Sequence, residues 1–144
     1  MSFAAADDRL IIAYSPLAQG FLAAKYDASN RPGGVRVTNP LFLEENLTRG
    51  HELLNTLRSV AKTHDATPAQ VALAWVIRRH NVVAIPGASS VDQLVRNAEA
   101  ADLDLSDSED AQLTDASDQF KPLTGVAAAP AWFSSRLRNA AQRE

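Results

Sequence analysis

A short apolar run that ends at a proline–glycine turn and opens a helix constrains this chain more than any other stretch. Val82–Ile85 is β-branched and apolar and predicts a buried strand. Pro86 cannot continue a hydrogen-bond ladder, and Gly87 lets the backbone turn and lets a ligand approach closely. Ser90 is the predicted N-cap of the next helix, with Gln93 as its capping-box partner. A helix start exposes unpaired N–H groups, which suit a phosphate.

The helix that follows, roughly residues 91–101, has two predicted faces. Ser89, Gln93 and Asn97 lie one turn apart and form a polar row that suits the rest of a nucleotide. The opposite face is predicted to point into the core, through Val91, Leu94, Val95 and Ala98. An ordinary capped helix after a strand is the alternative, and this stretch alone favours it.

The composition excludes several classes of function. The 144 residues are 46% hydrophobic and 22% charged, which suits one packed domain. A net charge of -3 argues against nucleic acid or a membrane surface as partner, since both require clustered Lys and Arg. Without cysteine and with three widely spaced histidines, no metal site is predicted. No signal peptide or membrane span is visible, so we expect a cytoplasmic location.

A second apolar run, residues 10–14, predicts a parallel strand covered on both faces. A proline-containing loop follows it, and Gly20 permits an unusual backbone turn there. A longer loop with Lys25, Arg31 and Arg36 then runs to about residue 40. Such length is uncommon in a compact domain, so this loop is either a mobile surface segment or a lid over a bound anion.

Apolar spacing predicts helices between and after the two strands. Residues 44–64 form one predicted helix, with its buried stripe at Leu47, Leu54, Leu57 and Ala61. Thr67 and Ser106 are the predicted N-caps of two further helices, each with a capping box. The second of these buries Leu113, Ala116 and Phe120. From residue 121 the pattern weakens, and residues 131–144 are predicted to be a short amphipathic or disordered tail.

Two short strands with a helical crossover predict an α/β fold. In (β/α)₈ TIM barrels, a phosphate site is commonly built from the loops after strands seven and eight. Such barrels need about 250 residues. We therefore predict the C-terminal portion of a (β/α)₈ barrel, incomplete and helix-rich, with two short parallel strands. The unpaired strand edges predict a marginal monomer or self-association.

Four motifs in a fixed order resemble the C-terminal part of an aldo-keto reductase across residues 10–120: AYSPLAQG from Ala13, Lys25-Tyr26, TPAQVALAW from Thr67, and IPGAS from Ile85 with Gln93-Leu94 and Asn97. This resemblance implies a partial barrel over residues 1–120 that binds NADP, with NAD as the alternative, and a divergent tail over 121–144. The family reduces aldehydes and ketones. The implied cofactor-binding residues are Ser15, Pro16, Leu17, Gln19, Gly20, Lys25, Arg31, Gly87, Ala88, Ser89, Gln93 and Asn97, with Arg36 as the alternative to Arg31.

Tyr14 ends the first strand, where the family often stacks an aromatic ring on nicotinamide; a packed strand-end aromatic is the alternative. The family's chemistry uses an Asp, a Tyr, a Lys and a His on earlier strands, and nothing in this chain matches those segments. We therefore predict no catalytic residues, and an isolated chain that is inactive on aldehydes and ketones without a missing half. A catalytically silent nucleotide-binding or regulatory module and a truncated remnant are the alternatives. A fragment, a truncated reading frame and a natural short form all fit the sequence.

Overall fold

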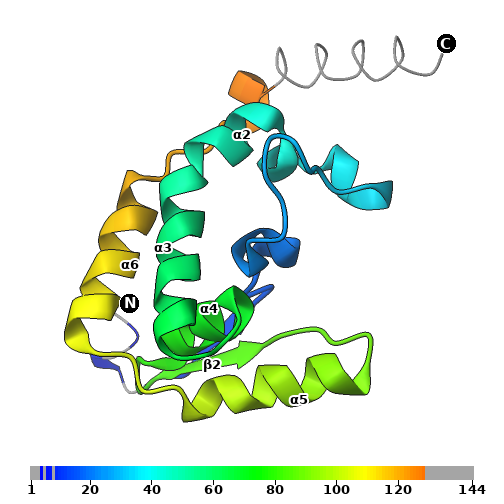
Figure 1. Cartoon of the computed structure of the whole chain (residues 1–144). Coiled ribbons are helices and arrows are strands. Elements are labelled where there is room, and N and C mark those ends of the chain that lie inside the picture. The colour runs from blue at the N-terminus through cyan, green and yellow to red at the C-terminus, as the bar shows by residue number, and fades with distance from the viewer. Residues whose placement is uncertain (1–3, 5, 8, 129–144) are drawn as a thin grey trace, which may run out of the picture.

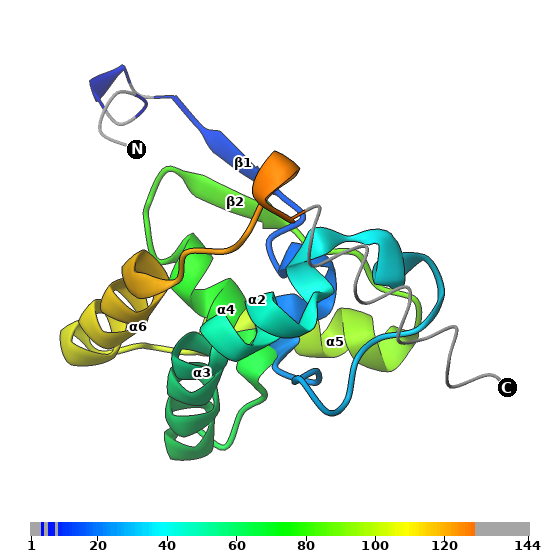
Figure 2. The same ribbon diagram turned by 90° about the horizontal axis from the view of Figure 1, so that it is seen from above.

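A two-stranded parallel sheet ties the beginning of the chain to its middle. The computed structural model describes residues 4, 6–7 and 9–128, without the side chain of residue 35. Strand β1 (Ile11–Tyr14) pairs with β2 (Val82–Ile85), so that Ile11 lies opposite Val82 and Tyr14 opposite Ile85. Both predicted strands are present, parallel and adjacent; Figure 1 shows β2 next to α4, and Figure 2 shows β1 beside β2. The prediction of an incomplete, helix-rich α/β barrel portion is confirmed.

Helix α4 is the centre of the packing. It contacts β2, α3 and α5, while α3 also packs against α6. Figure 2 shows α3 beside α6, and α5 on the other side of α4. The α-helices are α2 (Glu44–Arg49), α3 (His51–Thr63), α4 (Pro68–Ile77), α5 (Val91–Glu99) and α6 (Asp107–Gln119). Short 3-10 helices are η1 (Ala18–Ala23), η2 (Gly34–Thr38), η3 (Pro40–Phe42), η4 (Ala100–Asp102) and η5 (Gly125–Ala128).

The core lies between α2, α3, α4 and α6. Leu57, Val71 and Leu113 are fully buried, and the predicted stripe of the 44–64 segment is buried throughout. That segment is nevertheless two helices, which corrects the prediction of one. Gly50, with φ -79° and ψ 0°, is the residue between them. Its missing side chain makes room for the Phe21 ring, because a Cβ there would lie 2.5 Å from Cζ of Phe21.

Helix starts follow the predicted side-chain chemistry, with one change. Thr67 and Ser106 both form complete capping boxes. Ser90 caps α5 by accepting from the backbone N–H of Gln93 at 3.2 Å. The Gln93 side chain does not return to Ser90, however; its Oε1 accepts from the backbone N and the Oγ of Ser89. The Gln93 part of that predicted capping box is therefore wrong. Its side-chain oxygen instead holds Ser89, the residue before the N-cap.

One face of the sheet and the apolar face of α5 are open, which contradicts two predictions. On the sheet, Ile12, Tyr14, Val83 and Ile85 are exposed, so the strands are not covered on both faces. On α5, the residues predicted to face the core are all exposed: Val91, Leu94, Val95 and Ala98. The spacing correctly indicates apolar stripes, but in the described part of the chain no element packs over them.

The segment after α6 returns to α2. The amide of the fully buried Asn46 donates to the Leu123 carbonyl at 3.0 Å, and the Leu123 N–H donates back at 2.7 Å. Among the helices within 4–128 that the structure describes, none has the length and apolarity needed to cross a bilayer. The predicted tail at residues 131–144 lies outside the described residues, and the boundary at residue 120 stays a prediction.

Candidate functional site

The loops after the two strands line a single cavity. Parallel strands place their carboxyl ends at one edge of a sheet, where ligands commonly bind in α/β folds. A cavity of about 920 Å³ lies at this edge. It is bounded by the loop after β1 with η1, the loop after β2 with the start of α5, and the start of α4. All predicted cofactor-binding residues except Arg31 line it: Ser15, Pro16, Leu17, Gln19, Gly20, Lys25, Gly87, Ala88, Ser89, Gln93 and Asn97.

The wall contributed by η1 depends on unusual backbone geometry. Gln19 and Gly20 have φ values of 57° and 96°, so the predicted turn at Gly20 is present. Arg36 Nε donates to the Gln19 carbonyl, and the Asn39 amide donates to the Gln19 side chain, both at 3.0 Å. These bonds hold the 34–39 segment against η1 and place the Arg36 guanidinium at the cavity. The long loop is thus tethered to the site at this point.

Arg31 and Gly87 differ from their predicted roles. Arg31 Nε donates to the Phe42 carbonyl at 3.2 Å, and the residue does not line the cavity. Arg36, named with it from the sequence, occupies the wall instead. Gly87 does not have a positive φ, so the turn after β2 does not require glycine for its backbone angles. Nothing lies within 4 Å of the position where its Cβ would be, which leaves open space beside the backbone.

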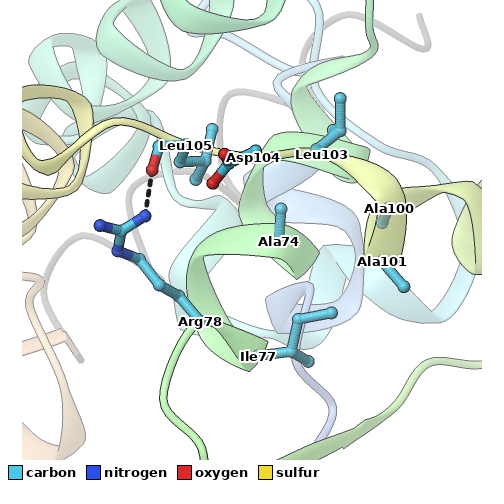
Figure 3. A pocket seen from close by; sticks show the side chains of 8 residues that line it. All are labelled: Ala74, Ile77, Arg78, Ala100, Ala101, Leu103, Asp104 and Leu105. Carbon is cyan, nitrogen blue, oxygen red and sulfur yellow. Dashed lines mark hydrogen bonds between the residues drawn. The ribbon is translucent and has the colours of Figure 1, made fainter.

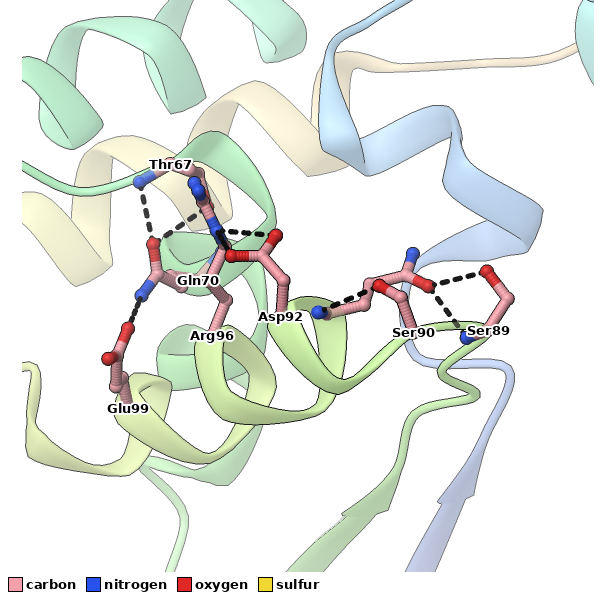
Figure 4. A network of polar contacts seen from close by, with 8 residues as sticks. Thr67, Gln70, Ser89, Ser90, Asp92, Arg96 and Glu99 are labelled. Carbon is pink, nitrogen blue, oxygen red and sulfur yellow. Dashed lines mark hydrogen bonds and ion pairs between the residues drawn. The ribbon is translucent and has the colours of Figure 1, made fainter.

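The wall contributed by α5 carries the predicted polar row, and Figure 4 shows Ser89 at its start. Ser89 donates its backbone N–H and its hydroxyl to Gln93 Oε1, at 2.8 and 3.0 Å. One turn on, the Asn97 amide donates to the Gly87 carbonyl at 3.4 Å. The row therefore lines the cavity as the spacing predicted, although its members already contact one another and the preceding loop.

Several lining residues were not among the predicted cofactor-binding residues. Asp92 and Arg96 lie on α5 beside the polar row, and Arg96 Nε is 3.2 and 3.1 Å from the two oxygens of Asp92. Their i,i+4 spacing, one residue ahead of Gln93 and Asn97, was a signal that would have found them. The start of α4 contributes Thr67 and Gln70, and the Gln70 amide donates to Glu99 at 3.1 Å (Figure 4). Only tertiary packing places this helix start in the cavity.

The charge of the lining favours an anion. Its cations are Lys25, Arg36 and Arg96, and its single carboxylate is Asp92. Tyr14 is 85% exposed on the open face of the sheet and does not line the cavity. In the described residues, no group of three or more His, Cys, Asp or Glu side chains is placed to hold a metal ion.

A second cavity, of about 480 Å³, lies between the end of α4, η4 and the strand-like segment before α6 (Figure 3). Arg78 lines it, donates to the Leu105 carbonyl and pairs with Asp107. The remaining lining is mainly alanine and leucine. Because both terminal nitrogens of the arginine join the end of α4 to residues at the start of α6, we interpret this hollow as structural.

Similarity to known proteins covers most of the chain. Residues 1–118 match the family model described as "Aldo/keto reductase family". An uncharacterized oxidoreductase of Mycobacterium tuberculosis is 58% identical over 122 residues, which are 85% of this chain and 38% of that protein. A probable aldo-keto reductase of Glycine max is 38% identical over 67% of this chain and 29% of its own length.

Similarity extends to a solved structure. The crystal structure of the thermostable aldo-keto reductase Tm1743 with the inhibitor epalrestat matches with a TM-score of 0.56 and 28% sequence identity. The match covers 80% of this chain and 32% of that one. The chain therefore spans about two fifths or less of the length of these relatives.

Proposed function

Because the chain belongs to the aldo/keto reductase family, we propose that it forms the dinucleotide-binding part of an NADP(H)-dependent oxidoreductase that interconverts carbonyls and alcohols. Support comes from one observation above all: both strand-end loops and the polar row of α5 line a single cavity. Its volume of about 920 Å³ lies within the range of cofactor and ligand pockets, about 300–1,000 Å³.

The residues of the lining fit the chemistry of a dinucleotide. Lys25 and Arg36 supply two positive charges for the two charges of a pyrophosphate. Ser89 lies at the start of α5, where the helix dipole favours a phosphate; its N–H and hydroxyl donate to Gln93 Oε1 in this structure and would exchange that oxygen for the phosphate. Gln93 and Asn97 carry amides farther along the same wall and suit the polar edge of adenine. The β1 loop, from Ser15 to Gly20, remains for the nicotinamide ribose.

The bound nicotinamide supplies or accepts a hydride, and the chain's own residues hold the dinucleotide. A proton donor has to reach the carbonyl oxygen within hydrogen-bond range. We assign no side chain of the described residues to that role, so we expect the isolated chain to bind cofactor and not to turn over an aldehyde. Turnover with NADPH would show that the chain does carry a proton donor. Binding without turnover also fits the alternative, a catalytically silent nucleotide-binding module.

Cofactor identity is part of the proposal. A Schizosaccharomyces pombe relative is named an NADP(+) aldo-keto reductase, and an Escherichia coli relative an NADH-specific methylglyoxal reductase. Both nucleotides therefore have to be titrated. The cytoplasmic location and the self-association expected from the sequence stay predictions.

Titration of the full chain with NADPH, followed by fluorescence, tests the proposal. Ser89→Asp places a carboxylate beside the phosphate and should weaken binding by roughly 1–3 kcal/mol. Ser108→Asp is the matched control, because Ser108 is exposed in the first turn of α6 and does not line the cavity. Equal affinities of the two variants, or no binding of either NADPH or NADH to the unaltered chain, would refute the proposed site.

A further inference from the structure

The two strands present an uncovered apolar face. On β1 this face carries Ile12 and Tyr14, and their register partners on β2 are Val83 and Ile85. All four side chains are between 45% and 85% exposed. On the opposite side, Val82 is buried and β2 contacts α4. Because parallel sheets occur almost only with both faces covered, this face lacks the cover that its pairing pattern requires.

Both outer edges of the sheet are also open. In the part of the chain that the structure describes, the sheet contains β1 and β2 alone. An exposed edge invites pairing with another chain, and natural proteins block it with charged side chains or proline within the strand. Neither strand has such a residue, since their sequences are IIAY and VVAI. Each edge is therefore free to accept a further strand.

Helix α5 adds three apolar side chains without cover. Its polar row lines the cavity, while Val91, Leu94 and Val95 on its apolar stripe are exposed. The four sheet residues and these three form what we call the open surface. Together they expose on the order of 700 Å², more than the about 300–600 Å² of the largest apolar patch on a typical monomer and close to the about 800 Å² that one partner contributes to a standard interface.

The residue types of the sheet face fit the inside of a (β/α)₈ barrel. Barrel interiors are filled by layers of inward side chains in which Val, Ile and Leu dominate, and Ile12, Val83 and Ile85 are of this kind. A second copy of this chain is a poorer occupant. It brings only two more strands, which leaves four, and a closed barrel has eight.

The length of the relatives fits the missing part of such a barrel. The match to the Mycobacterium tuberculosis oxidoreductase covers 122 residues, which are 38% of that protein, and leaves about 200 residues unmatched (122 ÷ 0.38 − 122 ≈ 200). Eight β/α units need about 250 residues, or about 31 residues each, so six units need about 190. The unmatched part therefore has the length of six units.

We propose that the open surface and the two free strand edges dock a separate polypeptide that contributes the other six β/α units of a barrel. Its terminal strands pair in parallel with the free edges of β1 and β2, and its side chains cover Ile12, Val83 and Leu94. The interaction goes beyond the proposed function and depends on it in one respect: the partner also brings the proton donor that we assign to no described residue.

Co-expression tests the proposal. The full chain is produced together with a tagged polypeptide made of the Mycobacterium tuberculosis relative without its 122 matched residues. The material purified through the tag should contain both polypeptides at a ratio of 1:1 by light scattering after size exclusion, with no dinucleotide added. The relative's own matched segment, produced as a separate chain, is the positive control.

Two substitutions locate the contact. Ile12→Lys on the sheet and Leu94→Lys on α5 each place a charge in an apolar interface and should raise the dissociation constant of the complex at least about tenfold. Val126→Lys is the matched control, because Val126 is 91% exposed on η5, which Figure 1 shows at the opposite end of the molecule from α5. Circular dichroism should show the same helicity in all three variants, since none of these positions is buried.

Three results would overturn the proposal. The first is the same dissociation constant for the three variants. The second is an unaltered chain that stays apart from the tagged polypeptide while the relative's own segment binds it. The third is a homodimer of the unaltered chain that Ile12→Lys dissociates, because a second copy then covers the open surface. NADPH binding to the chain is measured separately, so the proposed function stands or falls independently of these results.

Discussion

Asn46 joins three parts of the chain. Its substitution should therefore lower the free energy of unfolding more than the substitution of an exposed asparagine. The side chain is fully buried. Its amide donates to the carbonyls of Pro40 and Leu123, at 2.8 and 3.0 Å, and its oxygen accepts from the Leu123 N–H at 2.7 Å. Asn46→Ala removes all three bonds: the Pro40 carbonyl keeps its bond from the Leu43 N–H, while the half-buried backbone N–H and carbonyl of Leu123 lose this partner.

The magnitude follows from these contacts. A net hydrogen bond contributes about 0.5–1.5 kcal/mol, and an orphaned buried group costs about 1–3 kcal/mol. Three such bonds therefore give a loss of about 3 kcal/mol in the free energy of unfolding, which is a large part of the about 5–15 kcal/mol of a typical domain. Asn46→Asp should cost more at neutral pH, because its carboxylate then faces two carbonyl oxygens.

Urea unfolding followed by circular dichroism measures this loss. Asn55→Ala is the control, since Asn55 is exposed on α3 and bonds only to neighbouring side chains, His51 and Arg58; it should cost under about 0.5 kcal/mol. Asn46→Asp provides a second readout: burial raises the pKa of the new carboxyl in the folded state, so its stability should rise as pH falls from 7 toward 5. Equal losses for Asn46→Ala and Asn55→Ala would refute the reasoning.

Four further variants test the packing and one ionisable contact. Gly50→Ala should lower the melting temperature, because its Cβ would meet the Phe21 ring at 2.5 Å; an unchanged melting curve would contradict that contact. Leu94→Gln should leave the free energy of unfolding almost unchanged, since Leu94 is 60% exposed, whereas Leu57→Ala at a fully buried position should cost about 2–5 kcal/mol in urea. The two bonds from Ser106 lower the pKa of the Glu109 carboxyl below its usual 4.5 in the folded state. The stability that this carboxylate contributes is therefore present above pH 4.5 and is lost as the pH falls through the folded-state pKa. Glu109→Gln should make the urea midpoint depend less on pH over that acid range.

Local chemistry was predictable where neighbours in sequence supply it. Thr67 and Ser106 cap their helices through residues three positions away, and both capping boxes are present. Apolar spacing also located both strands. The contact of Gly50 with the Phe21 ring was not predictable, because Phe21 lies far back in the chain. Likewise the pattern of α5 shows that Leu94 belongs to an apolar stripe, but spacing does not say whether another element covers that stripe.

The candidate site also combines features that the sequence predicts with features that only tertiary packing determines. The two loops meet at one edge because parallel pairing of Val82–Ile85 with β1 requires it, and spacing was enough to predict that. Spacing could not show that Arg36 rather than Arg31 lines the cavity, because both arginines lie in one loop. Only the folded loop directs Arg31 to the Phe42 carbonyl. The start of α4 enters the cavity through helix packing alone.

The pairing of β1 with β2 also predicts an order of assembly. Ile11 lies opposite Val82, a separation of 71 residues (82 − 11 = 71). Closing a chain loop of that length costs about 4 kcal/mol of entropy. We therefore expect the first strand to join after α3 and α4 have brought the middle of the chain together, and to be the first to leave. The proposed dinucleotide site needs both loops, so we expect each bound molecule also to hold the first strand in place.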